Sequence, residues 1–465
     1  MYNFTLLLLW ILIATGTNGT EHSVEKTALK LTPMIRAGHI IEARKACKVE
    51  GLSEKVKSIE SYSGHLTVDD IHNSNLFFWF FPAMNGAAEA PVLLWLQGGP
   101  GIPSLYGLFE EHGPFSVSEE SGTIELRNHT WVSTHSMLYV DNPVNTGYSF
   151  SDDDAGYSKN QTEIGRNMYE ALLQFFTMFP EYQKNDFYVT GESYAGKYVP
   201  AVSYVIHKNN PNASLKINLK GMAIGNGLID PKLQALVHGE TRYQRGFIDD
   251  YTKNEIEKLE RSFSDRIDAG DFKKASILYN IVMMVFDSRT RLYTYNCIPN
   301  TYNTLSDQFV SAVTHRWVKY LNDSIVRTAL HVIGNQPLKY ELFKVLRFLE
   351  DHMQSVSPWL SALLDDGRYR VLLYSGQFDL VVPYSGTVSM ARSLRWSGAE
   401  HFKNATRTIW RVRGLENTTN VAGYATSFGP LTLLLVRNAG HMVPVDQPAR
   451  AHEMITRFTS GEPFQ

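Results

Sequence analysis

DFYVTGESYAGKYVP, residues 186–200, decides the fold, because a strand, a tight turn and the start of a helix follow one another in it. Phe187–Thr190 is a short apolar strand, and Tyr194–His207 has the apolar spacing of a helix. The turn between them has small residues two places before and two places after Ser193. This context predicts a nucleophile elbow, which lifts the serine above a sheet; without the strand and helix, the same residues would read as an ordinary turn.

Short apolar strands and helical segments alternate on both sides of this turn, with a helix expected over Glu163–Phe179. The other expected strands are Tyr62–Val68, Leu76–Pro82, Pro91–Leu96, Met137–Val140, Ile217–Ile224, Tyr369–Tyr374 and Leu431–Val436. Continuous apolar strands are typical of a buried parallel sheet, and the alternation favours an α/β protein. Together with the elbow, it predicts an α/β-hydrolase fold with a mostly parallel central sheet.

The strand pattern stops after Asp230 and returns only at Tyr369. We therefore expect a helical cap, residues 231–364, inserted between two halves of the core, residues 58–230 and 365–465. The cap should lie over Ser193. Residues 20–57 form an N-terminal arm.

The first 19 residues read as a signal peptide, because the apolar run Leu6–Ala14 is too short to span a bilayer and is followed by small residues. No lysine or arginine precedes the run, so an uncleaved anchor stays open as an alternative. The predicted glycosylation sequons are Asn128, Asn160, Asn212, Asn322, Asn404 and Asn417. These features predict the secretory pathway, with a secreted or lysosomal protein as the product.

The composition of the chain limits the classes of partner that we expect. A formal net charge of -3 over 465 residues gives no reason to expect nucleic acid, and no further apolar run predicts a membrane contact after signal removal. The sequence has neither a metal-binding HExxH motif nor a phosphate loop, so we expect no metal and no cofactor. Cys47 and Cys297 could pair, and a monomer and a homodimer are both compatible with the sequence.

Two later loops supply candidate partners for Ser193. Asp379 follows the strand YRVLLY, and His441 follows the strand LTLLLV, each on a loop marked by glycine. The order serine, aspartate, histidine is that of α/β-hydrolases. We expect His441 to be the general base and Asp379 to orient it.

Five segments in order, WLQGGPG, DNPVNTGYSF, GESYAGKYVP, YSGQFD and NAGHMVP, resemble the serine carboxypeptidase family from about Ser58 to Phe458. The resemblance implies removal of C-terminal residues from a peptide or protein with a free C-terminus, through an acyl-enzyme. It also implies site roles. The oxyanion donors would be the amides of Gly99 and Tyr194, and the substrate carboxylate would be bound by Gln97, Gly98, Glu111 and Glu192. The two glutamates would share a proton, because adjacent carboxylates do not both ionise cheaply. A proton shared between Glu111 and Glu192 would place this activity at acidic pH.

Two departures from the family pattern bear on activity. Ile102-Pro103 stands after GGPG where the family has other residues, and Asn145 replaces a glycine. Besides an active exopeptidase, two readings stay open: a catalytically weak homologue that acts as a binding or scaffold protein, and an acyltransferase or esterase on the same scaffold. The triad argues against the first, and the glutamate pair favours a substrate with a free carboxylate over the second.

Overall fold

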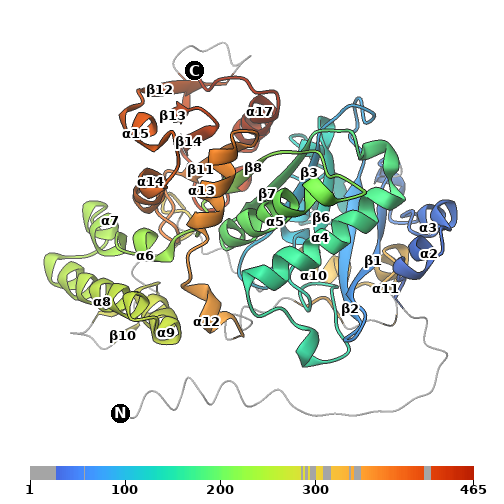
Figure 1. Cartoon of the computed structure of the whole chain (residues 1–465), viewed down its shortest axis with the longest axis horizontal. Helices are drawn as coiled ribbons and strands as arrows, with labels where there is room; N and C mark the ends of the chain where they lie inside the picture. The colour runs from blue at the N-terminus through green and yellow to red at the C-terminus, as the bar shows by residue number, and fades with distance from the viewer. Residues whose placement is uncertain are drawn as a thin grey trace.

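The computed structural model describes residues 28–56, 58–283, 286–287, 292–293, 300–306, 316–332, 334, 337–339, 347–412 and 420–465. Within these residues, a ten-stranded sheet forms the centre of the molecule (Figure 1). Its strands, in spatial order, are β1 (Tyr62–Asp69), β2 (Ser74–Phe81), β6 (Ser136–Val140), β3 (Val92–Leu96), β7 (Phe187–Glu192), β8 (Leu219–Gly225), β11 (Arg370–Gly376), β14 (Leu431–Val436), β13 (Val421–Phe428) and β12 (Arg407–Arg411).

The six middle strands, from β6 to β14, run parallel, and antiparallel pairs complete the sheet at both edges. The predicted α/β-hydrolase fold with a mostly parallel sheet is therefore confirmed. The middle strands are apolar along nearly their whole length, since they are buried on both faces. The edge strand β12 was not predicted, because four of its five residues are exposed and it has no apolar run.

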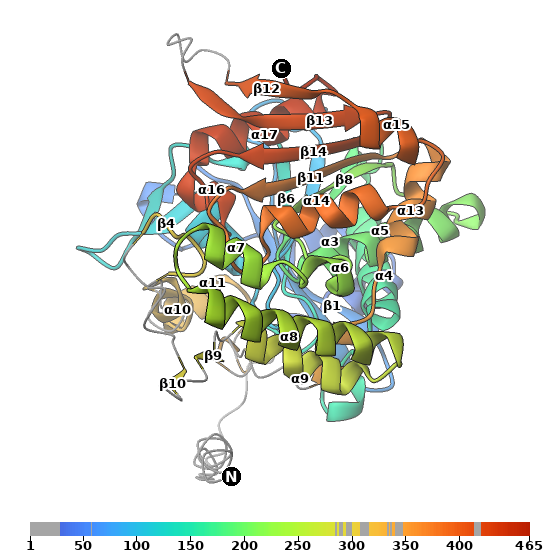
Figure 2. The ribbon, with the colours of Figure 1, turned by 90° about the vertical axis from the view of Figure 1, so that its left-hand side faces the viewer.

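Two long helices cover one face of the sheet, α4 (Gln161–Met178) and α5 (Ala195–Asn209), which pack against each other (Figure 1). Asn160 begins α4, since its side chain accepts a hydrogen bond from the Glu163 amide. The C-terminal part of the chain adds α14 (Tyr384–Ser393), α15 (Ala399–Asn404), α16 (Val443–Asp446) and α17 (Pro448–Thr459). Figure 2 shows α14 and α15 beside the strands β11 to β13.

In the described part of the segment between β8 and β11, all elements except two short strands are helices. Its helices are α6 (Pro231–Gln234), α7 (His238–Gln244), α8 (Asp250–Asp268), α9 (Phe272–Met283), α10 (Arg316–Leu321), α11 (Ser324–Ala329), α12 (Leu349–His352) and α13 (Ser357–Asp366). A small hairpin joins β9 (Phe286–Asp287) to β10 (Leu292–Tyr293), and another joins β4 (Phe115–Val117) to β5 (Ile124–Leu126) elsewhere in the chain. In Figures 1 and 2, α7, α8 and α9 form one group beside the sheet. In contrast, α13 packs on α5 and buries Leu360 and Leu363 in the main core.

The N-terminal arm packs on the edge of the sheet. Its helices, α2 (Thr32–Arg36) and α3 (Ile40–Ala46), lie at the far right of Figure 1. Leu31 is fully buried, and its amide donates to the His65 carbonyl in β1. At Gly64 an added Cβ would lie 2.8 Å from the Leu31 side chain, so β1 leaves space for this leucine only because it has a glycine there. The predicted signal peptide lies outside the described residues.

Leu31→Ala should lower the free energy of unfolding by about 2–5 kcal/mol, because it removes a fully buried side chain and leaves a cavity against β1. Guanidinium unfolding followed by tryptophan fluorescence measures the change. Ile41→Ala is the matched control, since Ile41 lies in the same arm with 81% of its surface exposed; it should change stability by less than about 0.5 kcal/mol. Equal effects of the two substitutions would show that the arm does not stabilise the core.

Candidate active site

Ser193 occupies the turn between β7 and α5 in a strained backbone conformation, with φ of +64°. The Ser193 amide donates to the Gly225 carbonyl at 2.9 Å, and the Ser193 carbonyl accepts from the Leu228 amide at 3.0 Å. A Cβ at Gly191 would lie 2.5 Å from the Leu96 carbonyl oxygen, so the turn needs glycine at that position. The serine itself is only partly buried. Strain of this kind at a non-glycine residue is typical of functional turns.

Asp379 and His441 meet at the carboxyl ends of β11 and β14. His441 Nδ1 lies 2.8 Å from Asp379 Oδ2, and both side chains are buried. Because a carboxylate oxygen only accepts, Nδ1 carries the hydrogen and Nε2 is the nitrogen left to act as a base. The amides of Val381 and Val382 also donate to Asp379, at 2.6 and 3.2 Å. These bonds fix the carboxylate that orients the imidazole.

Asn226 also holds Asp379, and the sequence did not point to it. Its Nδ2 donates to Asp379 Oδ2 at 2.7 Å, and its Oδ1 accepts from the Gly376 amide at 3.2 Å. The residue follows β8 with φ of +44°, a conformation that asparagine tolerates better than most residues. Its place directly after a middle strand, at the same sheet edge as Asp379, is the signal that could have identified it.

A segment of the insertion contacts the loops that hold Asp379 and His441. The Tyr302 carbonyl accepts from the His441 amide at 2.6 Å, and the two rings are 5.4 Å apart at 67°. The Leu380 amide donates to the Thr301 carbonyl at 3.0 Å. Residues 301–302 therefore help to place the candidate base and its orienting aspartate, although they lie far from both in the sequence.

The glycine loop after β3 abuts the elbow. A Cβ at Gly98 would lie 2.5 Å from the Tyr194 nitrogen and 2.8 Å from the Ser193 Cβ, so the two backbones touch. Gly99 has φ of +111°, which requires glycine. Among the described residues, no acceptor takes a hydrogen bond from the Gly99 or Tyr194 amide. Two unpaired amides beside a candidate nucleophile are what an oxyanion hole needs.

The structure brings Glu111 and Glu192 together in a fully buried cluster. Gln97 links this cluster to the sheet: its Nε2 donates to Glu192 Oε1 at 3.1 Å, and its Oε1 accepts from Trp95 Nε1 at 2.8 Å. Burial raises the pKa of Glu111 to about 8. Burial first, and the charge of Glu111 second, raise the pKa of Glu192 well above its usual value.

Both oxygens of Glu111 and Glu192 Oε2 are buried without a conventional donor in the described part of the chain. A proton shared between the two carboxyl groups would satisfy such oxygens, since a carboxylic acid donates to a carboxylate. Glu111 ends a short π-helix, η2 (Gly107–Glu111), and the Arg127 guanidinium donates to the nearby Gly113 and Phe115 carbonyls, both at 3.2 Å. Single π-turns of this kind are frequent at functional sites.

The two departures from the family pattern have local explanations. Ile102 and Pro103 leave the following residue in place, since Ser104 is buried and its Oγ accepts from the Gln97 amide at 3.1 Å. Asn145 has φ of +74°, and asparagine is one of the few residues other than glycine that adopt this conformation readily. Its side chain also accepts a hydrogen bond from Lys339 Nζ.

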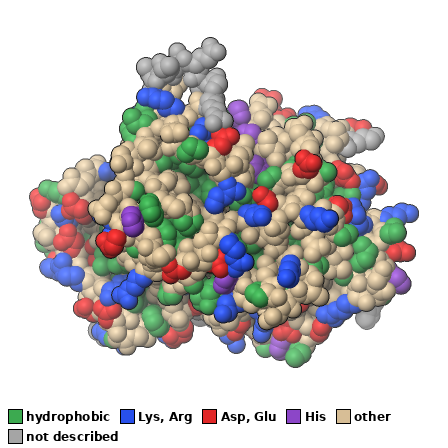
Figure 3. All heavy atoms as spheres, turned by 45° about the horizontal axis from the view of Figure 1, so that its top comes forward, with side chains coloured by type: hydrophobic (Ala, Val, Ile, Leu, Met, Phe, Trp, Pro, Cys, Tyr) green, Lys and Arg blue, Asp and Glu red, His purple; other side chains and the backbone are tan. Residues whose placement is uncertain are grey.

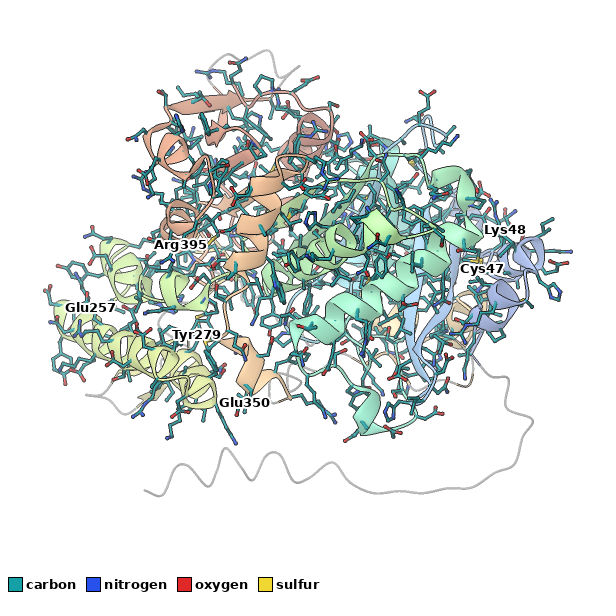
Figure 4. The ribbon with its side chains drawn as sticks, in the orientation of Figure 1. Cys47, Lys48, Glu257, Tyr279, Glu350 and Arg395 are labelled. Atoms are coloured by element: carbon teal, nitrogen blue, oxygen red, sulfur yellow. The ribbon has the colours of Figure 1, made fainter. Side chains whose placement is uncertain are left out.

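Other predicted positions lie away from these loops. Asn128, Asn212, Asn322 and Asn404 are exposed, Asn160 is half-buried as the cap of α4, and Asn417 lies outside the described residues. Cys47 is a buried free thiol at the end of α3, far from Tyr279 of α9 in Figure 4, while Cys297 lies outside the described residues. Within the described ranges, neither a membrane-length apolar helix nor a metal-binding group of side chains is found. On the face in Figure 3, basic and acidic side chains both occur.

The sheet order, the elbow after β7 and the Asp379–His441 contact at the ends of β11 and β14 are those of an α/β-hydrolase. Comparison with known protein families adds that residues 51–461 match the serine carboxypeptidase family. The chain belongs to this family, and the resemblance found in the five sequence segments is confirmed.

Individual relatives agree with this assignment. The chain is 44% identical to a venom serine carboxypeptidase of Apis mellifera, with 94% of this chain and 91% of the relative covered. It is 41% identical to a vitellogenic carboxypeptidase of Aedes aegypti, over 93% and 89% of the two chains. It is also 41% identical to the probable serine carboxypeptidase CPVL of Homo sapiens, over 93% and 90%.

A solved structure shows the same fold. The prohormone-processing carboxypeptidase Kex1 of Saccharomyces cerevisiae superposes with a TM-score of 0.77, covering 90% of this chain and 96% of that chain at 23% identity. At this identity, the likeness concerns the fold alone.

Gly98→Ala should reduce fluorophosphonate labelling of Ser193 by at least about 100-fold, because the new Cβ would push the glycine loop away from the Tyr194 amide. The labelling rate measures this directly. Gly239→Ala, in α7, is the control, since its Cβ would come within 3.3 Å of the Glu257 and Ile256 side chains and of the Lys253 carbonyl oxygen, which is tight but not under 3.0 Å; it should label at the wild-type rate. Normal labelling of Gly98→Ala would contradict the described contact between loop and elbow.

Glu111→Gln should alter how stability depends on pH. A pKa raised to about 8 means that the folded state keeps a proton that the unfolded state loses above about pH 4.5. Wild-type stability should therefore fall as pH rises from 5 to 8, by up to about 1.4 kcal/mol per pH unit relative to the variant. Unfolding curves at several pH values measure the difference. Glu120→Gln, at an exposed position, should follow the wild type; the same behaviour of Glu111→Gln would refute the raised pKa.

Proposed function

We propose that this chain hydrolyses the C-terminal peptide bond of peptides and proteins through an acyl-enzyme formed on Ser193. His441 takes the Ser193 proton through Nε2 and later delivers a proton to the leaving amine. Asp379 holds the imidazole in the tautomer that this requires, and the Gly99 and Tyr194 amides stabilise the oxyanion. The observation that carries the proposal is the 2.8 Å contact between His441 and Asp379 at the same sheet edge as the strained Ser193 turn.

The buried glutamates support the exopeptidase character. The pair of Glu111 and Glu192 lies next to the proposed nucleophile. Glu192 directly precedes Ser193 and accepts a hydrogen bond from Gln97 of the glycine loop. With one shared proton, the pair donates a hydrogen bond to a substrate carboxylate and does not repel it. Gln97 and the Gly98 amide complete the proposed carboxylate site. An esterase or acyltransferase on the same scaffold has no need of such a group.

We also propose the secretory pathway, with a secreted or lysosomal destination, and use of the described exposed sequons. The expected signal peptide and the exposure of Asn128, Asn212, Asn322 and Asn404 support this. An acidic compartment suits the glutamate pair, because the proton that it needs is retained there.

The pH dependence of hydrolysis tests the mechanism. For a blocked dipeptide with a free C-terminal carboxylate, KM should rise as pH increases through the raised pKa of the pair, near 8 for Glu111, because the pair then loses a proton and its negative charge repels the substrate carboxylate. The C-terminal amide of the same dipeptide makes no such contact, so its kcat/KM should hold to higher pH. The readout is kcat/KM against pH for both substrates, with Glu192→Gln as the variant that should remove the difference.

Ser193→Ala is the companion variant, which should abolish fluorophosphonate labelling and reduce hydrolysis by at least about 1000-fold. Identical wild-type profiles for acid and amide would mean that the glutamates do not bind the carboxylate. An unlabelled and inactive wild type would favour the binding-protein reading.

A further inference from the structure

Lys197 is a fully buried lysine in the first turn of α5, four residues after Ser193. Its Nζ lies 3.3 Å from Asp351 Oδ2 and donates to the main-chain carbonyls of Asp351 and His352, the latter at 3.1 Å. All three ammonium hydrogens therefore have acceptors on α12. A cation at the N-terminal end of a helix is unfavourable for the helix, so helix stability does not explain this lysine.

Asp351 is bound from a second side, by residues of the core. Gln161, at the start of α4, donates two hydrogen bonds to Asp351. Its side-chain Nε2 donates to Oδ2 at 2.7 Å, and its backbone N–H donates to Oδ1 at 3.3 Å. The Tyr194 hydroxyl donates to Asp351 Oδ2 at 3.4 Å. The carboxylate thus joins the starts of α4 and α5 to α12, whose position Figure 4 marks with Glu350.

Tyr194 is the residue that this network surrounds. Its ring is 5.3 Å from the His352 ring and 6.3 Å from the Phe348 ring, both on the insertion side. Lys197 Nζ lies 5.5 Å from the centre of the same ring. The side chain is 3% exposed, so its surroundings leave the backbone of Tyr194 little freedom.

We propose that Lys197 and Asp351 are positioning residues for the oxyanion hole: they hold the Tyr194 side chain so that its amide points at the oxyanion. The inference rests on the proposed function, which makes that amide an oxyanion donor. Neither residue touches the substrate. Burial lowers the pKa of Lys197 to about 8, which the Asp351 carboxylate opposes, so the lysine carries its positive charge in the acidic range. Replacing a buried ion pair by apolar residues often costs little stability, so the net stability of the pair alone does not account for these contacts.

The test compares Asp351→Asn and Lys197→Met with wild type on a blocked dipeptide. Each should lower kcat by about 10- to 100-fold, because a displaced donor stabilises the transition state less, and should leave KM within about twofold. Tyr194→Phe removes only the hydroxyl and should lower kcat in the same direction. The double variant of Tyr194→Phe and Asp351→Asn should be no slower than Asp351→Asn alone, since both remove one linkage.

The control is an ion pair on α17 between the buried Arg457 and the partly buried Glu453. Arg457→Met with Glu453→Gln should lower the melting temperature and leave kcat unchanged. If Asp351→Asn and Lys197→Met behave like this control, with lost stability and wild-type kcat, the positioning role is overturned. A rise in KM alone also overturns it. Should both fail to fold, a wild-type kcat for Tyr194→Phe overturns it equally. A wild type without activity or Ser193 labelling would instead reject the proposed function.

Discussion

The close approach of three backbone segments around Ser193 is the constraint on which the rest of the structure depends. The turn after β7 touches the glycine loop after β3 on one side and is bonded to the end of β8 on the other. Gly191 and Gly98 each leave less than 3 Å for a Cβ, so neither segment could approach with a side chain in the way. Neighbouring parallel strands supply this geometry, because their carboxyl ends meet at one edge. The strained φ of Ser193 persists because both flanking elements hold it.

The glutamate cluster lowers the stability of the fold. Two buried carboxyl groups with few donors cost stability at neutral pH, and the cost grows as they ionise. The Trp95–Gln97–Glu192 chain of hydrogen bonds and the π-helix that ends at Glu111 keep the groups together nonetheless. A cluster that is unfavourable for folding and yet held so firmly is characteristic of a binding or catalytic role.

From the sequence we could predict those features that a contiguous segment, or the order of residues along the chain, reveals. The strand, turn and helix around Ser193 are contiguous, and Asp379 and His441 follow apolar strands in a recognisable order. Asn226 was missed because asparagine after a strand reads as an ordinary turn residue, and its partner Asp379 lies 153 residues away. Asp351 was missed for the same reason, since its contacts with Gln161, Tyr194 and Lys197 exist only after the insertion folds back. Glu111 and Glu192 came from the family resemblance, because glutamates usually lie at the surface.

The order of the elements in the chain has a consequence for synthesis. Ser193 and its elbow belong to the first half of the core, whereas Asp379 follows the insertion and His441 follows β14, next to the last helices. The serine turn can form while the chain is still being made, but the imidazole that would activate it arrives only with the final strand. A chain that stops before residue 441 therefore has the serine turn without its candidate base, and the proposed hydrolysis requires both halves of the core.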